Sequence, residues 1–378
     1  DGRRLGLQGM INMLLQEADF PLQGNGIAEK AAELSPSNGL LLGRYITAIE
    51  EAKAKSNGDL SALIDPLMKC ISRNIPILGV TGTGGAGKSS LVDELVNRFL
   101  NDFPTRNVAV VSVDPTRQRT GGALLGDRIR MNSLARERVY LRSLATRTAR
   151  SEISDALAEA LIVLRAANFD FLIVETAGIG QGDAAIVPHC DVTAYVMTSE
   201  FGAPSQLEKI DMLDFADVVV INKFDHKGAE DALADVRKQF QRNHRLFDMP
   251  LEAMPVFGTI AAKFNDDGLT ALYQAVVALM NERTHCGWQS SLTATDRKTP
   301  SSTAIMIPPS RVRYLAEIAD TVERYHQQSA KQAEIAEKVW RLDGALSLLG
   351  GDDTEARREL EEKRSQLDAE LTENSHRI

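Results

Sequence analysis

Residues 82–89 read G-T-G-G-A-G-K-S and match the pattern G-x-x-x-x-G-K-[ST] at each of its fixed positions. Glycines at this spacing let backbone N–H groups turn toward phosphate oxygens, and the start of a helix adds the positive end of its dipole. Lys88 can then reach the β- and γ-phosphates, and the hydroxyl of Ser89 can bind Mg²⁺. An apolar strand run over 77–81 and a helical pattern from Ser90 stand on either side, as the motif requires. The chemistry indicated is the binding of a nucleoside triphosphate.

The same glycines support a second interpretation. Gly82, Gly84 and Gly87 also spell G-x-G-x-x-G, and Asp114 ends the next expected strand, where a dinucleotide-binding fold keeps its ribose-binding acid. An NAD(P)-binding oxidoreductase therefore remains an alternative. The lysine and serine that directly follow the last glycine are required in a phosphate loop and unexpected in a dinucleotide site, so they favour the triphosphate.

Residues 222–225, N-K-F-D, directly follow an apolar strand run at 218–221. The carboxylate of Asp225 can accept hydrogen bonds from two ring-edge N–H donors of guanine at once, a paired geometry that adds energy and selectivity. We expect Asn222 to address the other edge of the base and the stem of Lys223 to pack over the neighbouring loop. A polar tetrapeptide after a strand is also an ordinary turn, but the phosphate loop upstream favours guanine.

The segment 258–263 is expected to close over the base. It follows a strand expected over 254–257, so it begins at the same edge of the sheet as the other motifs. Thr259 and Ile260 are the residues that we assign to this contact.

Two acids stand at strand ends between the phosphate loop and the N-K-F-D motif. A strand over 108–113 ends in Asp114, and a strand over 171–174 ends in Glu175. Ligands of open α/β sheets collect at the carboxyl ends of the strands, so both acids should face the same side as Ser89. Oxygen ligands of this kind suit Mg²⁺, with water in the remaining positions. Either acid alone could be a cap or turn residue; together they favour a metal site.

The glycine-punctuated stretch 118–130 reads as a loop that the γ-phosphate and Mg²⁺ could order and that hydrolysis would release. Within it, Asp127 is a candidate outer metal contact and Arg130 a candidate phosphate contact. Gln181, in a second glycine-rich turn, is a candidate for orienting the attacking water, as a glutamine does in some GTPases. A Gly-Gln-Gly turn also needs no catalytic explanation.

The segments GTGGAGKSS, VDPTRQRTGGALLGDRIRM, VETAGIGQGD and NKFD resemble the G-protein chaperone family of adenosylcobalamin-dependent acyl-CoA mutases. The resemblance covers about residues 40–280. It implies a Mg²⁺-dependent GTPase that converts GTP to GDP and phosphate, and whose nucleotide state gates cobalamin loading and protects the mutase. The parent enzyme would then be an isomerase, and the partners would be its mutase and cobalamin domains.

The resemblance also implies roles for residues that match the family's motifs. Phosphate contacts are implied for consecutive residues of the loop: Gly84, Gly85, Ala86, Gly87, Lys88, Ser89 and Ser90. Magnesium contacts are implied for hydroxyl and carboxylate groups: Ser89, Asp114, Asp127, Glu175 and Thr176. Base contacts are implied for Asn222, Lys223 and Asp225. The residues that we assign to catalysis are Lys88, Asp114 and Gln181.

The flanking residues favour the fused members of this family, the isobutyryl-CoA mutases in which cobalamin, G and mutase domains share one polypeptide. Residues 1–10 lack an initiator Met and resemble the tail of a cobalamin domain, and 307–314 resemble the linker toward a mutase barrel. Residues 200–207 stand where standalone members carry Gly-Asp-Glu-Leu-Gln. No D-x-H-x-x-G motif is present, so adenosylcobalamin is expected to bind elsewhere in the parent enzyme. The alternative is a standalone GTPase chaperone of methylmalonyl-CoA mutase.

These motifs require an α/β fold to position them. Residues 74–287 alternate strand and helix, which predicts a P-loop NTPase three-layer sandwich with a mostly parallel sheet. Residues 1–73 are helical by pattern, and 288–378 comprise a Ser-, Thr- and Pro-rich linker followed by charged helices expected over 312–348 and 355–371. We expect that tail to move freely or to dock on another chain, which leaves a homodimer open.

Composition excludes several classes of protein. A formal net charge of −9 argues against a nucleic-acid-binding surface. The three cysteines show no C-x-x-C spacing, so neither a disulfide framework nor structural zinc is expected. No apolar run approaches the length of a membrane span and no signal peptide is visible, so we expect no membrane partner and a cytoplasmic location.

Overall fold

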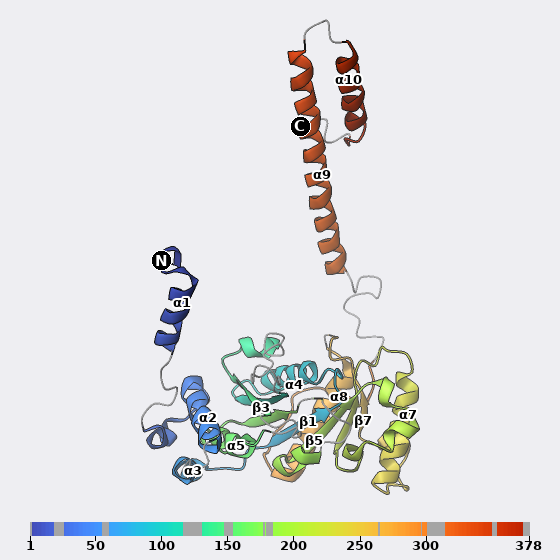
Figure 1. Ribbon diagram of the computed structural model, residues 1–378. Coiled ribbons are helices and arrows are strands. Elements are labelled where there is room, and N and C mark those ends of the chain that lie inside the picture. Colours follow the sequence, from blue (N-terminus) through green and yellow to red (C-terminus); the bar gives the residue numbers. More distant parts are fainter. Residues whose placement is uncertain are drawn as a thin grey trace. The chain divides into compact units, whose positions relative to one another are not determined.

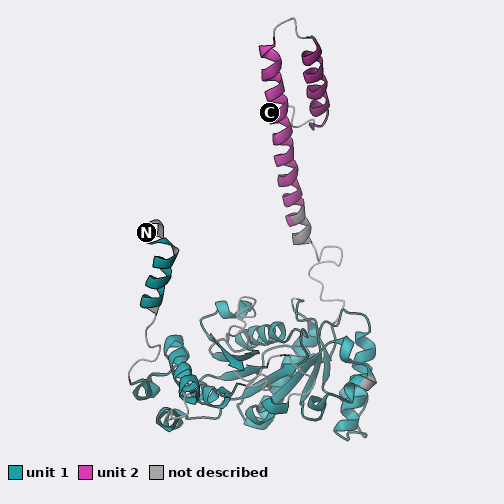
Figure 2. Ribbon diagram, in the orientation of Figure 1, with its two compact units in different colours: residues 1–304 teal, residues 305–378 magenta. Residues whose placement is uncertain are grey.

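A computed structural model of the chain is shown in Figure 1. It describes residues 2–18, 26–54, 60–115, 131–146, 154–176, 178, 184–263, 265–295, 297–300, 314–349 and 354–372. The chain divides into two compact units, residues 1–304 and 305–378 (Figure 2).

The first unit is built on a sheet of seven strands in the order β3-β2-β4-β1-β5-β6-β7. The pairings between the described strands are all parallel. The strands are buried apolar runs, as expected for a parallel sheet covered on both faces. Their bounds are β1 Ile77–Gly82, β2 Val108–Pro115, β3 Val139–Thr146, β4 Phe171–Glu175, β5 Val192–Met197, β6 Val218–Ile221 and β7 Val256–Gly258.

Helices of the first unit cover both faces of this sheet. The α-helices of this unit are α1 Gly2–Ala18, α2 Gly39–Ala54, α3 Leu60–Cys70, α4 Lys88–Asp102, α5 Leu157–Ala166, α6 Pro204–Leu207, α7 Ala229–Asn243 and α8 Asp267–Thr284, and those of the second unit are α9 Tyr314–Leu348 and α10 Thr354–Asp368. Short 3₁₀ helices are η1 Ile27–Glu33, η3 Asn132–Ala135, η4 Ala184–His189, η5 Ser199–Phe201, η6 Asp211–Asp214 and η7 Leu251–Ala253.

Alternation along the strands decides which helix packs on which face. Leu78 and Val80 of β1 belong to the core cluster that contains α4 and α8, whereas Ile77 belongs to the cluster that contains α2, α3 and α5. A third cluster joins α7 and η6 to β5, β6 and β7. The three-layer α/β sandwich expected from the sequence is therefore confirmed.

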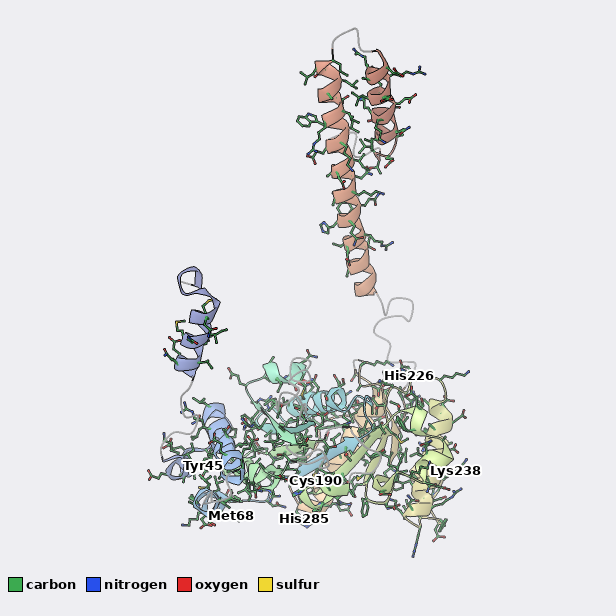
Figure 3. The ribbon with its side chains drawn as sticks, viewed as in Figure 1. Tyr45, Met68, Cys190, His226, Lys238 and His285 are labelled. Atoms are coloured by element: carbon green, nitrogen blue, oxygen red, sulfur yellow. The ribbon has the colours of Figure 1, made fainter. Side chains whose placement is uncertain are left out.

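Helices α2 and α3 are part of this sandwich. Tyr45 of α2, labelled in Figure 3, is 0% exposed. It lies in the same cluster as Leu67 of α3 and Val111 of β2. Its hydroxyl donates to the backbone oxygen of Leu63 at 2.7 Å. Burial, with the nearby Cys70, raises the pKa of Tyr45 to about 12. Helices α2 and α3 therefore share a core with the sheet across the expected boundary after residue 73.

Replacing Tyr45 by Phe should lower the free energy of unfolding by about 0.5–1.5 kcal/mol, because the hydrogen bond from the buried hydroxyl to the half-buried carbonyl of Leu63 is lost. Urea unfolding would show a lower midpoint with an unchanged slope. Tyr325 of α9 is 69% exposed, so Tyr325→Phe is the matched control and should leave the midpoint unchanged. Equal midpoints for the two variants would contradict the role assigned to the Tyr45 hydroxyl.

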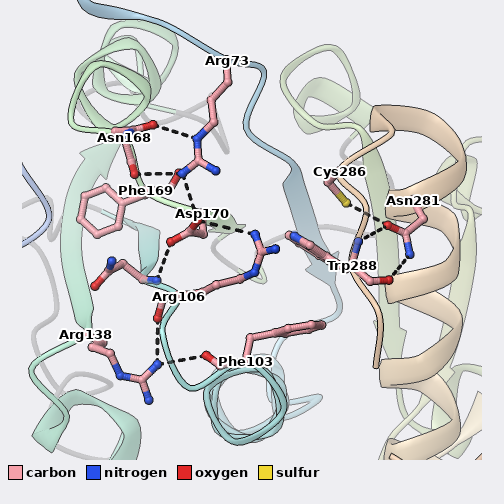
Figure 4. A network of polar contacts seen from close by, with 11 residues as sticks. Arg73, Phe103, Arg106, Arg138, Asn168, Phe169, Asp170, Asn281, Cys286 and Trp288 are labelled. Atoms are coloured by element: carbon pink, nitrogen blue, oxygen red, sulfur yellow. Dashed lines mark hydrogen bonds and ion pairs between the residues drawn. The ribbon is translucent and has the colours of Figure 1, made fainter. Parts of the chain in front are cut away.

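The described residues after α8, 285–295 and 297–300, pack on the first unit, whereas we expected a linker from residue 288. Trp288 is 3% exposed, and its ring centroid lies 5.0 Å from that of Phe99 and 5.1 Å from that of Phe171. The side chain of Asn281 accepts a hydrogen bond from the backbone N–H of Trp288 and donates one to its carbonyl oxygen (Figure 4). Further on, the N–H of Gly258 donates to the carbonyl of Lys298 at 2.8 Å. A single large aromatic side chain thus ties a polar segment to the core of the first unit.

The second unit is a pair of charged helices, α9 and α10, close to the ranges expected from the sequence. Arg364 of α10 donates to Asp343 of α9 at 2.6 Å. Gln332 accepts from the N–H of Thr372 at 2.7 Å, so the residues that follow α10 lie beside the middle of α9. None of the helices in the described part of the chain combines the length and apolarity needed to cross a bilayer.

Candidate nucleotide site

The phosphate loop joins β1 to α4 at the carboxyl edge of the sheet. β1 pairs with both β4 and β5 in the middle of the strand order, the place where open α/β sheets bind ligands. Gly82 has φ 143°, and a Cβ there would lie 1.8 Å from the carbonyl oxygen of Val196 on β5. Gly87 has φ 86° directly before α4, and its Cβ would lie 2.5 Å from the Nδ2 of Asn222. Only glycine fits either position.

Lys88 begins α4 and is 7% exposed. Its Nζ donates to the carbonyl oxygens of Gly82 at 3.1 Å and Thr83 at 3.0 Å. The ammonium therefore lies within the loop that the sequence assigns to the phosphates. Gly84, Gly85 and Ser90 are exposed around the same loop, and Ala86 is buried.

The residues proposed to bind Mg²⁺ are brought together in part. The hydroxyl of Ser89 donates to Oε1 of Glu175 at 2.6 Å, although the two residues are 86 positions apart in the sequence. Asp114 is 6% exposed, and its Oδ1 accepts from Ser112, the residue that pairs with Glu175 across β2 and β4. The hydroxyl of Thr176 points elsewhere and donates to Thr81 at 2.8 Å.

This donor set fits magnesium, which prefers hard oxygen ligands and usually takes one or two carboxylates together with substrate phosphates and water. In the part of the chain that the structure describes, no group of three or more His, Cys, Asp or Glu could hold a metal ion. The phosphates of a bound nucleotide would therefore have to supply ligands beside Ser89, Asp114 and Glu175.

The N-K-F-D motif follows β6. Asp225 is exposed, and Lys223 adopts φ 56° in the turn. Asn222 is 3% exposed, and its amide has partners at both ends: Nδ2 donates to the carbonyl of Ala86 at 2.8 Å, and Oδ1 accepts from the hydroxyl of Thr259 at 3.1 Å. We expected this amide to address the base. In the structure it ties the phosphate loop to the segment after β7, because a buried amide must find partners within the protein.

The segment after β7 is held by a residue that the motifs did not reveal. Asp266 is 0% exposed and directly precedes α8. Its Oδ2 accepts from the N–H of Leu269 at 2.9 Å and from the N–H of Ile260 at 3.3 Å. Burial raises the pKa of Asp266, opposed by these two N–H donors and by the charges of Lys263 and Arg98. An aspartate before an apolar-periodic run is an N-cap signal, so the sequence did contain a cue.

Three predicted residues of the site, Asp127, Arg130 and Gln181, lie outside the described residues.

Comparison with known proteins identifies relatives along the whole chain. A family profile described as methylmalonyl-CoA mutase-associated GTPase MeaB matches residues 42–343. The fused isobutyryl-CoA mutase of Geobacillus kaustophilus is 49% identical over 383 residues, covering 100% of this chain and 35% of that protein. The fused isobutyryl-CoA mutase of Cupriavidus metallidurans is 48% identical over 352 residues, covering 93% of this chain and 32% of that protein. The chain thus spans about a third of the length of these relatives.

Among solved structures, a LAO/AO transport system kinase matches with a TM-score of 0.50 and 19% identity, covering 90% of this chain and 98% of that one. At this identity the likeness concerns the fold alone.

Proposed function

Because this chain belongs to the family of the methylmalonyl-CoA mutase-associated GTPase MeaB, we propose that it is the guanine-nucleotide domain of a fused isobutyryl-CoA mutase. In this proposal, hydrolysis of GTP to GDP and phosphate gates the loading of adenosylcobalamin and protects the mutase. Identity of 49% along 100% of the chain supports the fused form over a standalone chaperone of methylmalonyl-CoA mutase.

The chain is a GTPase of this family, so the NAD(P)-binding oxidoreductase that the glycine pattern left open does not hold. The physical reason is the side chain that follows the last glycine. Lys88 is buried within the loop, where an ammonium neutralises a polyphosphate.

The length of the relatives supports the domain organisation that we propose. They are about three times longer than this chain, which supports cobalamin and mutase domains acting on it in cis. Residues 74–287 would carry the nucleotide motifs of the GTPase domain. Residues 1–73 would follow the cobalamin domain, with α2 and α3 packed on the GTPase sheet. Residues 288–378 would lead toward the mutase, starting from Trp288 in the GTPase core. Adenosylcobalamin would bind to those neighbouring domains.

The observation that carries the proposed chemistry is the contact between Ser89 and Glu175 beside Lys88 at the first turn of α4. We propose that GTP enters with its phosphates against the loop's N–H groups. Lys88 would then release its carbonyl partners and neutralise charge on the γ-phosphoryl group. Mg²⁺, held by Ser89, Asp114 and Glu175, supplies further positive charge when bound. Gln181 is proposed to orient the attacking water.

At the other end of the site, Asp225 is the proposed guanine acceptor. Asp225 is exposed to solvent, whereas Asn222 is buried and its amide already bonds to other groups of the protein. Lys223 and the backbone near Thr259 and Ile260 would complete the base site.

Phosphate release from GTP tests this proposal. We expect slow hydrolysis that requires Mg²⁺, prefers GTP to ATP, and rises when an adenosylcobalamin-loaded isobutyryl-CoA mutase is added. Stimulation by methylmalonyl-CoA mutase alone would favour the standalone chaperone. Indifference to both mutases would overturn the coupling and leave a GTPase without this partner.

A further inference from the structure

One buried carboxylate joins the two ends of the proposed nucleotide site. Asp266 caps α8 through the N–H of Leu269 and also accepts from the N–H of Ile260, in the segment after β7. The capping bond alone would explain the residue's place before a helix. The bond to Ile260 is additional, and it reaches back six residues to the segment assigned to the base.

The next amide along the chain is held from the opposite side. The N–H of Ala261 donates to Oδ1 of Asn222 at 3.0 Å, while Nδ2 of Asn222 donates to the carbonyl of Ala86 in the phosphate loop. Consecutive N–H groups at Ile260 and Ala261 therefore bond to side chains on different elements. The backbone at Ile260 and Ala261 cannot rotate or shift without breaking at least one of these bonds.

A second path runs from Asp266 back to the phosphate loop through α4. Arg98 of α4 donates to the carbonyl of Asp266 and to the hydroxyl of Thr270, each at 3.4 Å. The hydroxyl of Thr270 also donates to that carbonyl at 3.0 Å. Since α4 begins at Lys88, this second path returns to the phosphate loop along the backbone of the helix.

A carboxylate is a costly way to cap a helix at this position. Oδ1 of Asp266 is buried without a hydrogen-bond partner among the described residues, and an unpaired buried charge is unfavourable. Serine or asparagine caps a helix about as well and carries no charge. What the carboxylate adds is a charge-assisted bond to Ile260 made together with the cap.

We propose that Asp266 is a positioning residue for guanine recognition. It holds the amides of Ile260 and Ala261 at a set place relative to Asn222 and the phosphate loop, so that one nucleotide can engage its base and its phosphates together. The proposal rests on the base site proposed around Asp225.

The test uses two variants of the whole chain. Asp266→Ser keeps a cap for α8, but its short side chain cannot also reach Ile260. We expect its affinity for GTP and GDP to fall about tenfold, as for loss of a bond to a charged group, while its affinity for tripolyphosphate stays unchanged. Asp266→Asn keeps the shape with a neutral acceptor, and we expect about a threefold loss for GTP and none for tripolyphosphate. Calorimetry measures the affinity of each variant for GTP and for tripolyphosphate, and circular dichroism checks that each variant is folded.

Unchanged GTP affinity in both variants would overturn the proposal. So would an equal loss for GTP and tripolyphosphate, since that pattern reports general damage to the phosphate loop. If Asp266→Ser does not fold, Asp266→Asn carries the test alone. A wild-type chain that binds GTP and ATP equally well would instead refute the base site itself, before any variant is compared.

Discussion

Replacing Lys88 by alanine is expected to slow GTP hydrolysis by about 10²–10³-fold, the usual cost of removing one preorganised charge-stabilising group. The ammonium lies within the phosphate loop, bonded to the carbonyls of Gly82 and Thr83, and no other described side chain makes these contacts. Phosphate release in a single turnover at saturating GTP and Mg²⁺ measures the effect. Lys209, an exposed lysine, supplies the control Lys209→Ala, which should hydrolyse GTP at the wild-type rate.

Arginine should not rescue position 88. A Cβ on Gly178 would lie 2.2 Å from the Nζ of Lys88, so the backbone of the segment after β4 passes directly beside the ammonium. A guanidinium is larger and planar and would collide there. Substantial GTP hydrolysis by either Lys88→Ala or Lys88→Arg would contradict the role assigned to this side chain.

Replacing Asp225 by asparagine is expected to weaken GTP binding by about 10²-fold and to favour xanthosine over guanosine nucleotides, because one acceptor of the paired carboxylate becomes a donor. Asp225 is exposed, so the free energy of unfolding should change by no more than about 0.5 kcal/mol. Competition between GTP, XTP and ATP for the same site measures the shift.

Asp248 is an exposed aspartate, and Asp248→Asn should retain wild-type selectivity. If Asp225→Asn binds GTP as tightly as the wild type, the base site has been assigned to the wrong residue.

The sequence was informative where structure is encoded locally. The strand runs expected at 77–81, 108–113, 171–174 and 218–221 are present as β1, β2, β4 and β6. Buried parallel strands are apolar along their whole length, and a phosphate loop needs glycines at set positions, so both leave a local pattern.

The segment after α8 shows where a local pattern misleads. Residues 288–309 are polar on average, which reads as a linker. The start of this segment nevertheless packs on the core of the first unit, because the ring of Trp288 is buried against the rings of Phe99, Phe103 and Phe171. The average composition of a segment does not indicate that one of its large apolar side chains will be buried in the core.

By itself, the sequence determined which chemical groups this protein carries: a lysine and a serine behind a glycine loop, acids at strand ends, and an aspartate after β6. Only the tertiary structure decided which of them meet. Ser89 bonds to Glu175 across 86 positions, and Asn222 bonds to Ala86 across 136, while Asp266 holds a segment that no motif assigned to it. Such pairings depend on the order of strands in the sheet and on which face each side chain occupies. They also follow from the need of each buried polar group for a partner, which is met by whichever element the fold brings alongside.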